Sequence, residues 1–291
     1  MSSYDLGGHS GCQIFLIDND DGRVFVRKIS KDVDYNARLE TQSVKQASFK
    51  GAIVRAPKVL ETGYMADGRF FFDMEYIQGM TLAEYIKTME IGKVKGLVEA
   101  LVNSFIPKEI PVLTQDDKEQ VVQIFAKKIS ELRKTLSTQN NEVVNQSLEL
   151  LEKHDWSKLA PSQCHGDMTL ENIIIKNDKM YLIDFLDSFY DSWFLDIGTL
   201  LQDIQVMWSY RHQEDISMNT VLRLIVFRDL LVNEVRKINE DFVIEIYYSL
   251  LQKLIRIYPY AKDELTYSFL NEKTRLVIEN IRKLEMTRGG A

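Results

Sequence analysis

The feature that most constrains this chain is a polar segment, Cys164–Asn172, which carries a histidine, an aspartate and an asparagine directly before the apolar run Ile173–Ile175. A second apolar run, Tyr181–Phe185, follows shortly afterwards and contains Asp184 near its end. Short runs of β-branched residues bounded by polar clusters are typical of strands. The sequence therefore predicts a loop, a strand, a turn and a second strand that ends in a carboxylate.

The bulk composition limits the classes of function that this arrangement can serve. The chain has 291 residues, enough for one large domain or two smaller ones, and a net charge of −7, which argues against a nucleic-acid partner. No apolar run approaches the roughly 20 residues that span a bilayer, so no membrane partner is expected. The two cysteines, Cys12 and Cys164, are too few for a disulfide scaffold. We expect a soluble, cytoplasmic protein, and its oligomeric state is left open.

The first part of the chain has the pattern of a small sheet. Gln13–Ile17 and Arg23–Ile29 are β-rich runs joined by a turn that ends in Asp-Gly, a strong hairpin signal. A polar segment at 34–50 is compatible with a helix, and Pro57–Glu61 and Arg69–Ile77 predict two more strands. This segment is therefore β-β-α-β-β, and residues 78–80 are interpreted as a linker.

Helical periodicity dominates the chain after this linker. Thr81 and Glu84 have the spacing of a capping box. Residues 92–112 are mixed, with a loop expected at the two prolines, and residues 287–291 are expected to form a disordered tail. The predicted helices are 116–136, 143–151, 197–208, 221–235, 242–255 and 265–284.

These residues resemble the aminoglycoside phosphotransferase and choline kinase family, the small-molecule branch of the protein-kinase-like fold. The resemblance rests on His165-Gly166-Asp167, on Asn172, and on Ile183-Asp184-Phe185, and it extends from about Gly7 to Trp208. It implies an α+β, bilobal fold. A small antiparallel β lobe with one helix, residues 1–78, would bind the nucleotide, and a larger, mainly helical lobe, residues 79–291, would carry the catalytic and substrate-binding residues.

The resemblance also implies roles for the polar residues. Asp167 would orient the acceptor hydroxyl and take its proton, and Asn172 and Asp184 would hold Mg²⁺ beside the phosphates of ATP or GTP. His165 would complete the catalytic set by holding the loop through hydrogen bonds. Asp196 is interpreted as a helix cap or a brace for this loop.

The nucleotide-binding residues of the first lobe remain open at several positions. Arg27 and Lys28 are adjacent and so point to opposite faces of a strand, and either one can be the cation that contacts the phosphates. Glu40 is the candidate ion-pair partner, although the expected register lies nearer Gln42 or Ser43. Two further contacts are predicted with the nucleotide, one from the hydroxyl of Ser10 in a glycine-rich loop and one from the backbone of the linker at Glu75–Ile77.

The sequence favours a small acceptor over a protein. Only about a dozen residues separate Asp184 from Asp196, and Gly166 stands where regulated protein kinases carry an arginine. We expect an ATP/Mg-dependent kinase that phosphorylates a hydroxyl on a sugar, an amino sugar or an amino alcohol. The alternative is a catalytically weak, regulatory module that binds a nucleotide or metabolite. For Asp187 and Asp191 two interpretations remain: they are either solvated turn residues or substrate contacts. The candidate substrate contacts are Trp193, Asp203, Trp208, Tyr210, Arg211, Tyr247 and Tyr248.

Overall fold

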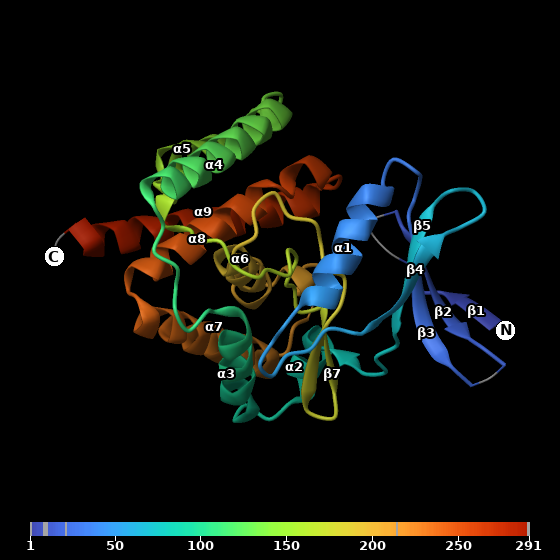
Figure 1. Ribbon diagram of the computed structural model, residues 1–291. Coiled ribbons are helices and arrows are strands. Elements are labelled where there is room, and N and C mark those ends of the chain that lie inside the picture. The colour runs from blue at the N-terminus through green and yellow to red at the C-terminus, as the bar shows by residue number, and fades with distance from the viewer. Residues whose placement is uncertain (1, 8–10, 21, 214, 290–291) are drawn as a thin grey trace.

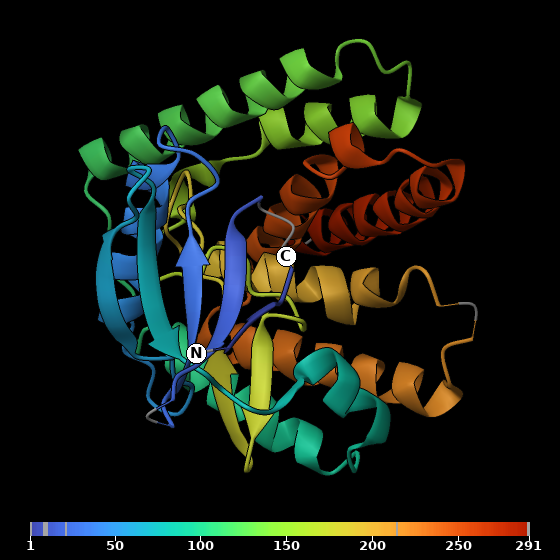
Figure 2. The ribbon, with the colours of Figure 1, turned by 90° about the vertical axis from the view of Figure 1, so that its right-hand side faces the viewer.

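The computed structural model describes residues 2–7, 11–20, 22–213 and 215–289, and its chain forms a small sheet at one side of a larger group of helices (Figure 1). Five antiparallel strands make the sheet in the order β1-β2-β3-β5-β4. Their bounds are β1 (Ser2–Asp5), β2 (Gln13–Asp18), β3 (Val24–Ile29), β4 (Val59–Tyr64) and β5 (Phe70–Glu75). Figure 2 shows the molecule from the side on which this sheet lies, with the helices beside and behind it.

One helix covers the sheet and closes a small apolar core. In α1 (Asn36–Ser48), Leu39 is fully buried, and it belongs to a cluster with Val26, Phe70, Phe72 and Met74 from the strands. Phe70, Phe72 and Met74 alternate along β5, and Val26 of the central strand β3 lies opposite Met74, which places these side chains on the face that α1 covers. The antiparallel β lobe with one helix that the sequence predicts is confirmed.

A second sheet contacts the segment before β4, since Arg55 forms a parallel bridge with Tyr181 of this sheet. Its strands are β6 (Met80–Thr81), β7 (Ile173–Lys176) and β8 (Lys179–Leu182), in the order β6-β7-β8. The turn between β7 and β8 contains Asn177 and Asp178 at φ of 50° and 57°, a conformation that Asn and Asp adopt more readily than other residues with side chains. The predicted strand, turn and strand are present, and the carboxylate of Asp184 follows two residues after the second strand.

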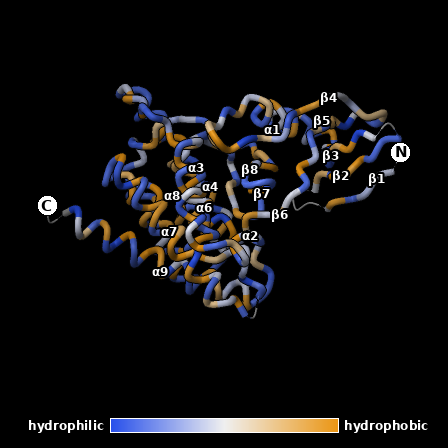
Figure 3. The backbone as a smooth tube through the Cα atoms, turned by 90° about the horizontal axis from the view of Figure 1, so that it is seen from below, coloured by the Kyte–Doolittle hydropathy of each residue, from blue (hydrophilic) through white to orange (hydrophobic). Residues whose placement is uncertain are grey.

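The helical part is built around two buried helices, α6 (Trp193–Ile204) and α8 (Asp241–Ile255). Every residue of α6 is buried, as is every residue of α8 from Val243 onward. The surrounding helices are α2 (Leu82–Thr88), α3 (Lys93–Phe105), α4 (Gln115–Leu136), α5 (Glu142–Lys153), α7 (Met218–Ile238) and α9 (Glu264–Gly289). Three short 3-10 helices connect them, η1 (Trp156–Lys158), η2 (Trp208–Tyr210) and η3 (Tyr258–Tyr260). Hydrophobic positions recur along these helices in Figure 3.

Four segments differ from the sequence prediction. Strand β1 has no counterpart in the sequence prediction, because its four residues, two serines, a tyrosine and an aspartate, carry no apolar pattern. Helix α3 forms where a mixed segment was expected, since Val94, Val98, Leu101 and Phe105 make a buried stripe. Helix α6 begins at Trp193, four residues before the predicted start.

The end of the chain is the fourth difference. Residues 287–289 continue α9 instead of forming a tail. Thr287 donates to the carbonyl of Lys283, and Arg288 pairs with Asp241 at 2.7 Å, so the last turn is held from both sides. Among the described helices, none combines the length and the apolar character needed to cross a membrane.

Candidate functional site

The structure separates the two adjacent cations of β3. Lys28 is 2% exposed, and its ammonium group forms an ion pair with Asp184 and donates to Oε1 of Gln42 at 3.3 Å. Arg27 points to the opposite face, where its guanidinium forms two hydrogen bonds of 2.7 and 2.8 Å with Asp73 and lies over the ring of Phe71. The hydrogen bond to Asp73 raises the pKa of Arg27. Lys28 is therefore the cation that reaches the second lobe, and Arg27 is a structural residue of the sheet.

The partner of Lys28 on α1 is Gln42, and the prediction for Glu40 is wrong. Glu40 is exposed, whereas Gln42 is 2% exposed and faces Lys28. Two residues along a helix correspond to a rotation of about 200°, so Glu40 and Gln42 lie on opposite faces. A neutral amide thus stands beside the lysine where an acid was predicted, and Asp184 forms the only ion pair of Lys28 among the described residues.

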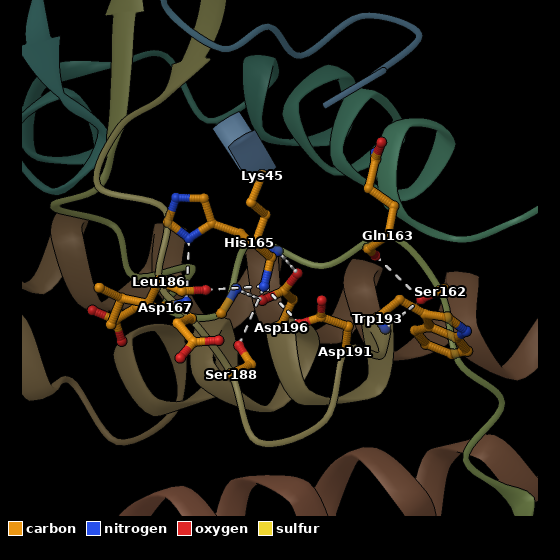
Figure 4. A network of polar contacts seen from close by, with 12 residues as sticks. Lys45, Ser162, Gln163, His165, Asp167, Leu186, Ser188, Asp191, Trp193 and Asp196 are labelled. Atoms are coloured by element: carbon orange, nitrogen blue, oxygen red, sulfur yellow. Dashed lines mark hydrogen bonds and ion pairs between the residues drawn. The ribbon is translucent and has the colours of Figure 1, made fainter. Parts of the chain in front are cut away.

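The polar loop after Cys164 is held by the carboxylate of Asp196, in the first turn of α6. Its two oxygens accept hydrogen bonds from the backbone N–H groups of His165 at 2.6 Å and Gly166 at 2.9 Å (Figure 4). Gly166 has φ +96°, and a Cβ there would lie 2.6 Å from Oγ of Ser188 and 2.7 Å from the carbonyl oxygen of Leu186. Only glycine fits this position, so an arginine of the kind found in regulated protein kinases is sterically excluded.

Both ring nitrogens of His165 form hydrogen bonds within the protein. Nε2 lies 2.8 Å from the carbonyl oxygen of Ile183 and must therefore carry the hydrogen, while Nδ1 accepts from the N–H of Asp167 at 3.2 Å. The side chain is fully buried, and desolvation lowers the pKa of His165. The neutral histidine ties the loop to the strand end at Ile183, and neither ring nitrogen is free to act as a base.

Asp167, Asn172 and Asp184 meet in one cleft. The amide nitrogen of Asn172 donates to the carbonyl oxygen of Asp167 at 2.9 Å and to its carboxylate Oδ2 at 3.2 Å. Asp184 has φ +61°, an uncommon conformation for a residue with a side chain, and its carboxylate is 36% exposed. These three residues and Lys28 line the same cleft, whose volume is about 980 Å³.

The donor set at the cleft suits a hard divalent cation. Because its nitrogen faces Asp167, Asn172 presents its amide oxygen, which has no hydrogen-bond partner among the described residues. Asp184 contributes a partly exposed carboxylate beside it. One or two protein oxygens, completed by phosphate oxygens and water, are what Mg²⁺ takes in phosphate-binding sites. The residues therefore fit Mg²⁺.

The linker end of the cleft suits a flat apolar ring. The backbone N–H and C=O of Ile77 make no hydrogen bond with any described residue, whereas the N–H of Glu75 is already bonded to the carbonyl of Lys58 at 2.9 Å. The apolar walls come from Ile14, Val26, Met74, Ile174 and Ile183. Ile77 thus offers a donor and an acceptor to a nucleobase. The predicted contact from Ser10 lies outside the described residues, although Leu6 and Gly7 just before it line the cleft.

A family model for the phosphotransferase enzyme family matches residues 5–222, three quarters of the chain. The chain belongs to the phosphotransferase enzyme family. The matched span contains Lys28, Ile77, Asp167, Asn172 and Asp184 of the cleft, and its limits agree with the resemblance that the sequence motifs indicate.

Solved structures of low sequence identity share the fold of this phosphotransferase. A choline kinase from Cryptosporidium parvum Iowa II has a TM-score of 0.59 at 13% identity, with 99% of this chain and 90% of that chain covered. A thermostable mutant of aminoglycoside phosphotransferase APH(4)-Ia, in ternary complex with ADP and hygromycin B, has a TM-score of 0.59 at 12% identity, covering 96% and 93%. A protein assigned as a fructosamine-3-kinase from Haemophilus somnus 129PT has a TM-score of 0.58 at 16% identity, covering 95% and 91%. No curated protein matches the chain by sequence.

Most of the residues predicted to contact the substrate do not line the cleft. Trp193, Tyr210, Tyr247 and Tyr248 are buried in the helical core, because their positions on α6, η2 and α8 face other helices. Only Trp208 and Arg211 line the cleft, and Arg211 lies 4.0 Å above the Trp208 ring.

Asp203 is also a brace rather than a substrate contact. It is fully buried and accepts from the N–H groups of Leu170 at 2.7 Å and Ser209 at 3.0 Å. Desolvation raises its pKa to about 6, and the two hydrogen bonds oppose that shift. Asp203 thus connects the loop after Asp167 to the start of η2.

The loop after Asp184 is held from the first lobe. Lys45 of α1 reaches across to donate to the carbonyl of Leu186 at 2.9 Å and to pair with Asp191 at 2.6 Å (Figure 4). Asp187 lies 3.9 Å from Arg38. Both aspartates left open by the sequence therefore pair with cations of α1, and neither lines the cleft.

Three residues on the far side of Asp167 were not predicted from the sequence. Gln202 of α6 and Lys253 of α8 are buried, and Arg256 follows directly after α8. All three line a second cavity that shares Asp167 with the main cleft. A signal was present for Lys253, since a lysine within the apolar run Leu250–Ile255 is rarely buried without a specific role.

Proposed function

We propose that this phosphotransferase transfers the γ-phosphoryl group of ATP (or GTP), with Mg²⁺, to a hydroxyl group of a small molecule such as a sugar, an amino sugar or an amino alcohol. The observation that carries the proposal is the meeting of Lys28, Asp184, Asn172 and Asp167 in one cleft. We further propose a division into a nucleotide-binding lobe, residues 1–78, and a catalytic and substrate-binding lobe, residues 79–291.

The nucleotide side of the proposal rests on charge and on free backbone groups. Lys28 would contact the phosphates, held in place by Asp184 and Gln42. Ile77 would exchange hydrogen bonds with the base, and the apolar residues around it would exclude water. When bound, Mg²⁺ supplies positive charge that offsets the charge on the phosphates, and Asp184 and the amide oxygen of Asn172 would hold it.

Asp167 would act on the acceptor. Its Oδ2 accepts from Asn172, which fixes the carboxylate plane, and its Oδ1 has no hydrogen-bond partner among the described residues. In the proposed step the acceptor oxygen bonds to the γ-phosphorus, its proton moves to Asp167, and the bond between the γ-phosphorus and the bridging oxygen of the nucleoside diphosphate breaks. Asp196 and His165 would act as positioning residues, because they accept hydrogen bonds from the backbone N–H groups of residues 165–167.

A screen for release of nucleoside diphosphate tests the proposal. The purified chain is mixed with ATP or GTP and Mg²⁺ and with single members of a panel of sugars, sugar acids, amino sugars and amino alcohols. We expect at least one acceptor to stimulate diphosphate release, and EDTA to abolish that release. If the chain binds ATP·Mg but no acceptor stimulates release, the regulatory, nucleotide-binding alternative replaces this proposal.

A further inference from the structure

A second cavity opens beside Asp167, away from the nucleotide side. Its volume is about 410 Å³, within the range of small-molecule sites, and it shares Asp167, Gln202 and Trp208 with the main cleft. Neither Lys28 nor Asp184 lines it. Asp167 therefore lies at the junction between the nucleotide side and this cavity, which is where an acceptor hydroxyl must lie during phosphoryl transfer.

The cavity carries an excess of positive charge. Its ionisable residues, apart from Tyr260, are three cations, Lys128, Lys253 and Arg256, and two carboxylates, Glu131 and Asp167. Lys128 and Glu131 form an ion pair at 3.2 Å and so neutralise one another. Lys253 and Arg256 then remain opposite the single carboxylate of Asp167. This is the reverse of the whole chain, which has a net charge of −7.

Arg256 is the cation with unused hydrogen-bonding capacity. Its side chain forms no hydrogen bond and no ion pair with any residue that the structure describes, and it is exposed to solvent. As an arginine it keeps its positive charge in proteins. Its planar guanidinium can therefore bind two oxygens of one anionic group.

Lys253 is the second cation without a carboxylate partner in this cavity, and it is buried. It is 8% exposed, and the one hydrogen bond recorded for its ammonium group runs to the carbonyl oxygen of Gly166 at 3.0 Å. No carboxylate forms an ion pair with it among the described residues. A buried lysine without an anionic partner is costly, and desolvation lowers its pKa, so an anion bound in the cavity would relieve that cost.

We propose that the acceptor carries an anionic group, a carboxylate or a phosphate ester, which Arg256 and Lys253 bind in this cavity while the acceptor hydroxyl lies at Asp167. The inference rests on the proposed phosphoryl transfer and narrows its substrate class to hydroxy acids or phosphorylated sugars. An amine would meet like charges at Arg256 and Lys253, which disfavours the cationic members of the panel. Gln202 is 7% exposed, and its side chain forms no hydrogen bond with any described residue, so it supplies a neutral polar contact at the junction.

The test uses pairs of acceptors that differ by one charged group. Gluconate is compared with glucitol, glycerate with glycerol, and glucose 6-phosphate with glucose; ethanolamine, choline and glucosamine represent the cations. The first two pairs probe a carboxylate and the third probes a phosphate ester. Release of ADP is measured at equal acceptor concentrations for the wild-type chain. We expect the anionic member of at least one pair to be the better substrate by about tenfold or more.

Variants then assign the effect to Arg256. Arg256→Gln is expected to lower kcat/KM for the anionic acceptor by about 30- to 1000-fold and to leave the KM for ATP within about twofold. Arg256→Lys should recover part of the loss, because it restores the charge without the bidentate geometry. Arg282→Gln, the same change at an exposed arginine of α9, controls for net charge. Circular dichroism and the melting temperature verify that each variant is folded.

The outcomes separate this inference from the proposed function. If neutral or amine acceptors are turned over and their anionic counterparts are not, the phosphotransferase proposal stands and the anionic acceptor is excluded. An equal loss for all acceptors in Arg256→Gln, or a raised KM for ATP, would also overturn the inference. If no compound of any class stimulates ADP release above the level of Asp167→Asn, the proposed function and the inference fall together.

Discussion

The two sides of Asp167 differ in how their cations are used. On the nucleotide side, Lys28 is buried and already bonded to Asp184 and Gln42. On the other side, Arg256 is exposed and unbonded among the described residues, and Lys253 has only a carbonyl oxygen as partner. Lys28 is thus held in position by the protein before any ligand binds. Arg256 and Lys253 instead carry positive charge that no carboxylate of the described residues pairs with.

This difference has a physical origin. The ion pair with Asp184 offsets the several kcal/mol that transfer of the Lys28 charge from water would cost, whereas the buried ammonium of Lys253 has only a carbonyl oxygen as partner among the described residues. Lys28 is therefore bound to partners from α1 and from the loop after β8, and it couples those elements to β3. A solvent-accessible arginine needs no partner within the protein. Arg256 can therefore bind a ligand without a change in the fold. Under the proposed function, the cation of the nucleotide side also holds elements of the fold together, whereas the cations of the acceptor side serve to select the acceptor.

The largest expected effect concerns the junction itself. Asp167→Asn should lower kcat by about 10²- to 10⁴-fold, the usual contribution of a general base, and leave the affinity for nucleotide within about twofold. Asp184→Asn should abolish turnover and also weaken Mg²⁺-dependent nucleotide binding. Steady-state kinetics and fluorescence titration with a labelled nucleotide measure both effects. Asp187→Asn, three residues after Asp184 and outside the cleft, is the control, and a near-normal rate in Asp167→Asn would contradict the assignment.

A second test separates the two cations of β3. Lys28→Met should lower kcat/KM for ATP by about 10²-fold, because a preorganised donor to the phosphates is lost. Arg27→Met should leave kcat/KM unchanged and lower the free energy of unfolding by about 1–3 kcal/mol, since it leaves the buried Asp73 without its partner. The pair is measured by ADP release and by urea unfolding. A kinetic defect in Arg27→Met comparable to that of Lys28→Met would remove the distinction.

The loop at Gly166 provides a third test. Gly166→Ala should lower the free energy of unfolding by about 3–5 kcal/mol, from the strained positive φ together with the displacement of Ser188 and Leu186. Gly96→Ala, in α3 with no atom near the added Cβ, should instead raise it by about 0.5–1 kcal/mol. Urea unfolding of both variants gives the comparison. Equal stability of the two would show that the loop adjusts at no cost.

A fourth test concerns a pH dependence at Asp203, which joins the loop after Asp167 to the start of η2. Burial raises the pKa of this carboxyl to about 6, above its value of about 4 in the unfolded chain. Its contribution to stability is therefore complete below pH 4 and is lost as the pH rises through 6, by a total of about 3 kcal/mol.

Asp203→Asn removes that titration. The free energy of unfolding of the wild type, minus that of Asp203→Asn, should fall between pH 4 and pH 7. Urea unfolding at pH 4, 5, 6 and 7 measures this difference for each pH. A difference that stays constant, or that rises with pH, would mean that the pKa of Asp203 is not raised in the folded protein.

Much of the fold was predictable because its signals are local. The hairpin of β2 and β3 and the strand pair β7 and β8 each follow from apolar runs and turn residues within one short segment. Helix α3 was missed because its buried stripe adjoins two prolines, and β1 was missed because an edge strand of polar residues has no apolar pattern. Their formation depends on neighbours that the segment itself does not contain.

The sequence by itself determined the family. It also determined that Asp167, Asn172 and Asp184 lie close together, because a loop and the adjoining hairpin bring these three residues together over a short stretch of chain. Only the tertiary structure decided that Lys28 faces the cleft, that Gln42 is its partner in place of Glu40, and that Arg256 lies beside Asp167. Each of these depends on which face of an element is buried against another. That choice is made by packing between segments far apart in the chain, and periodicity within one segment does not reveal it.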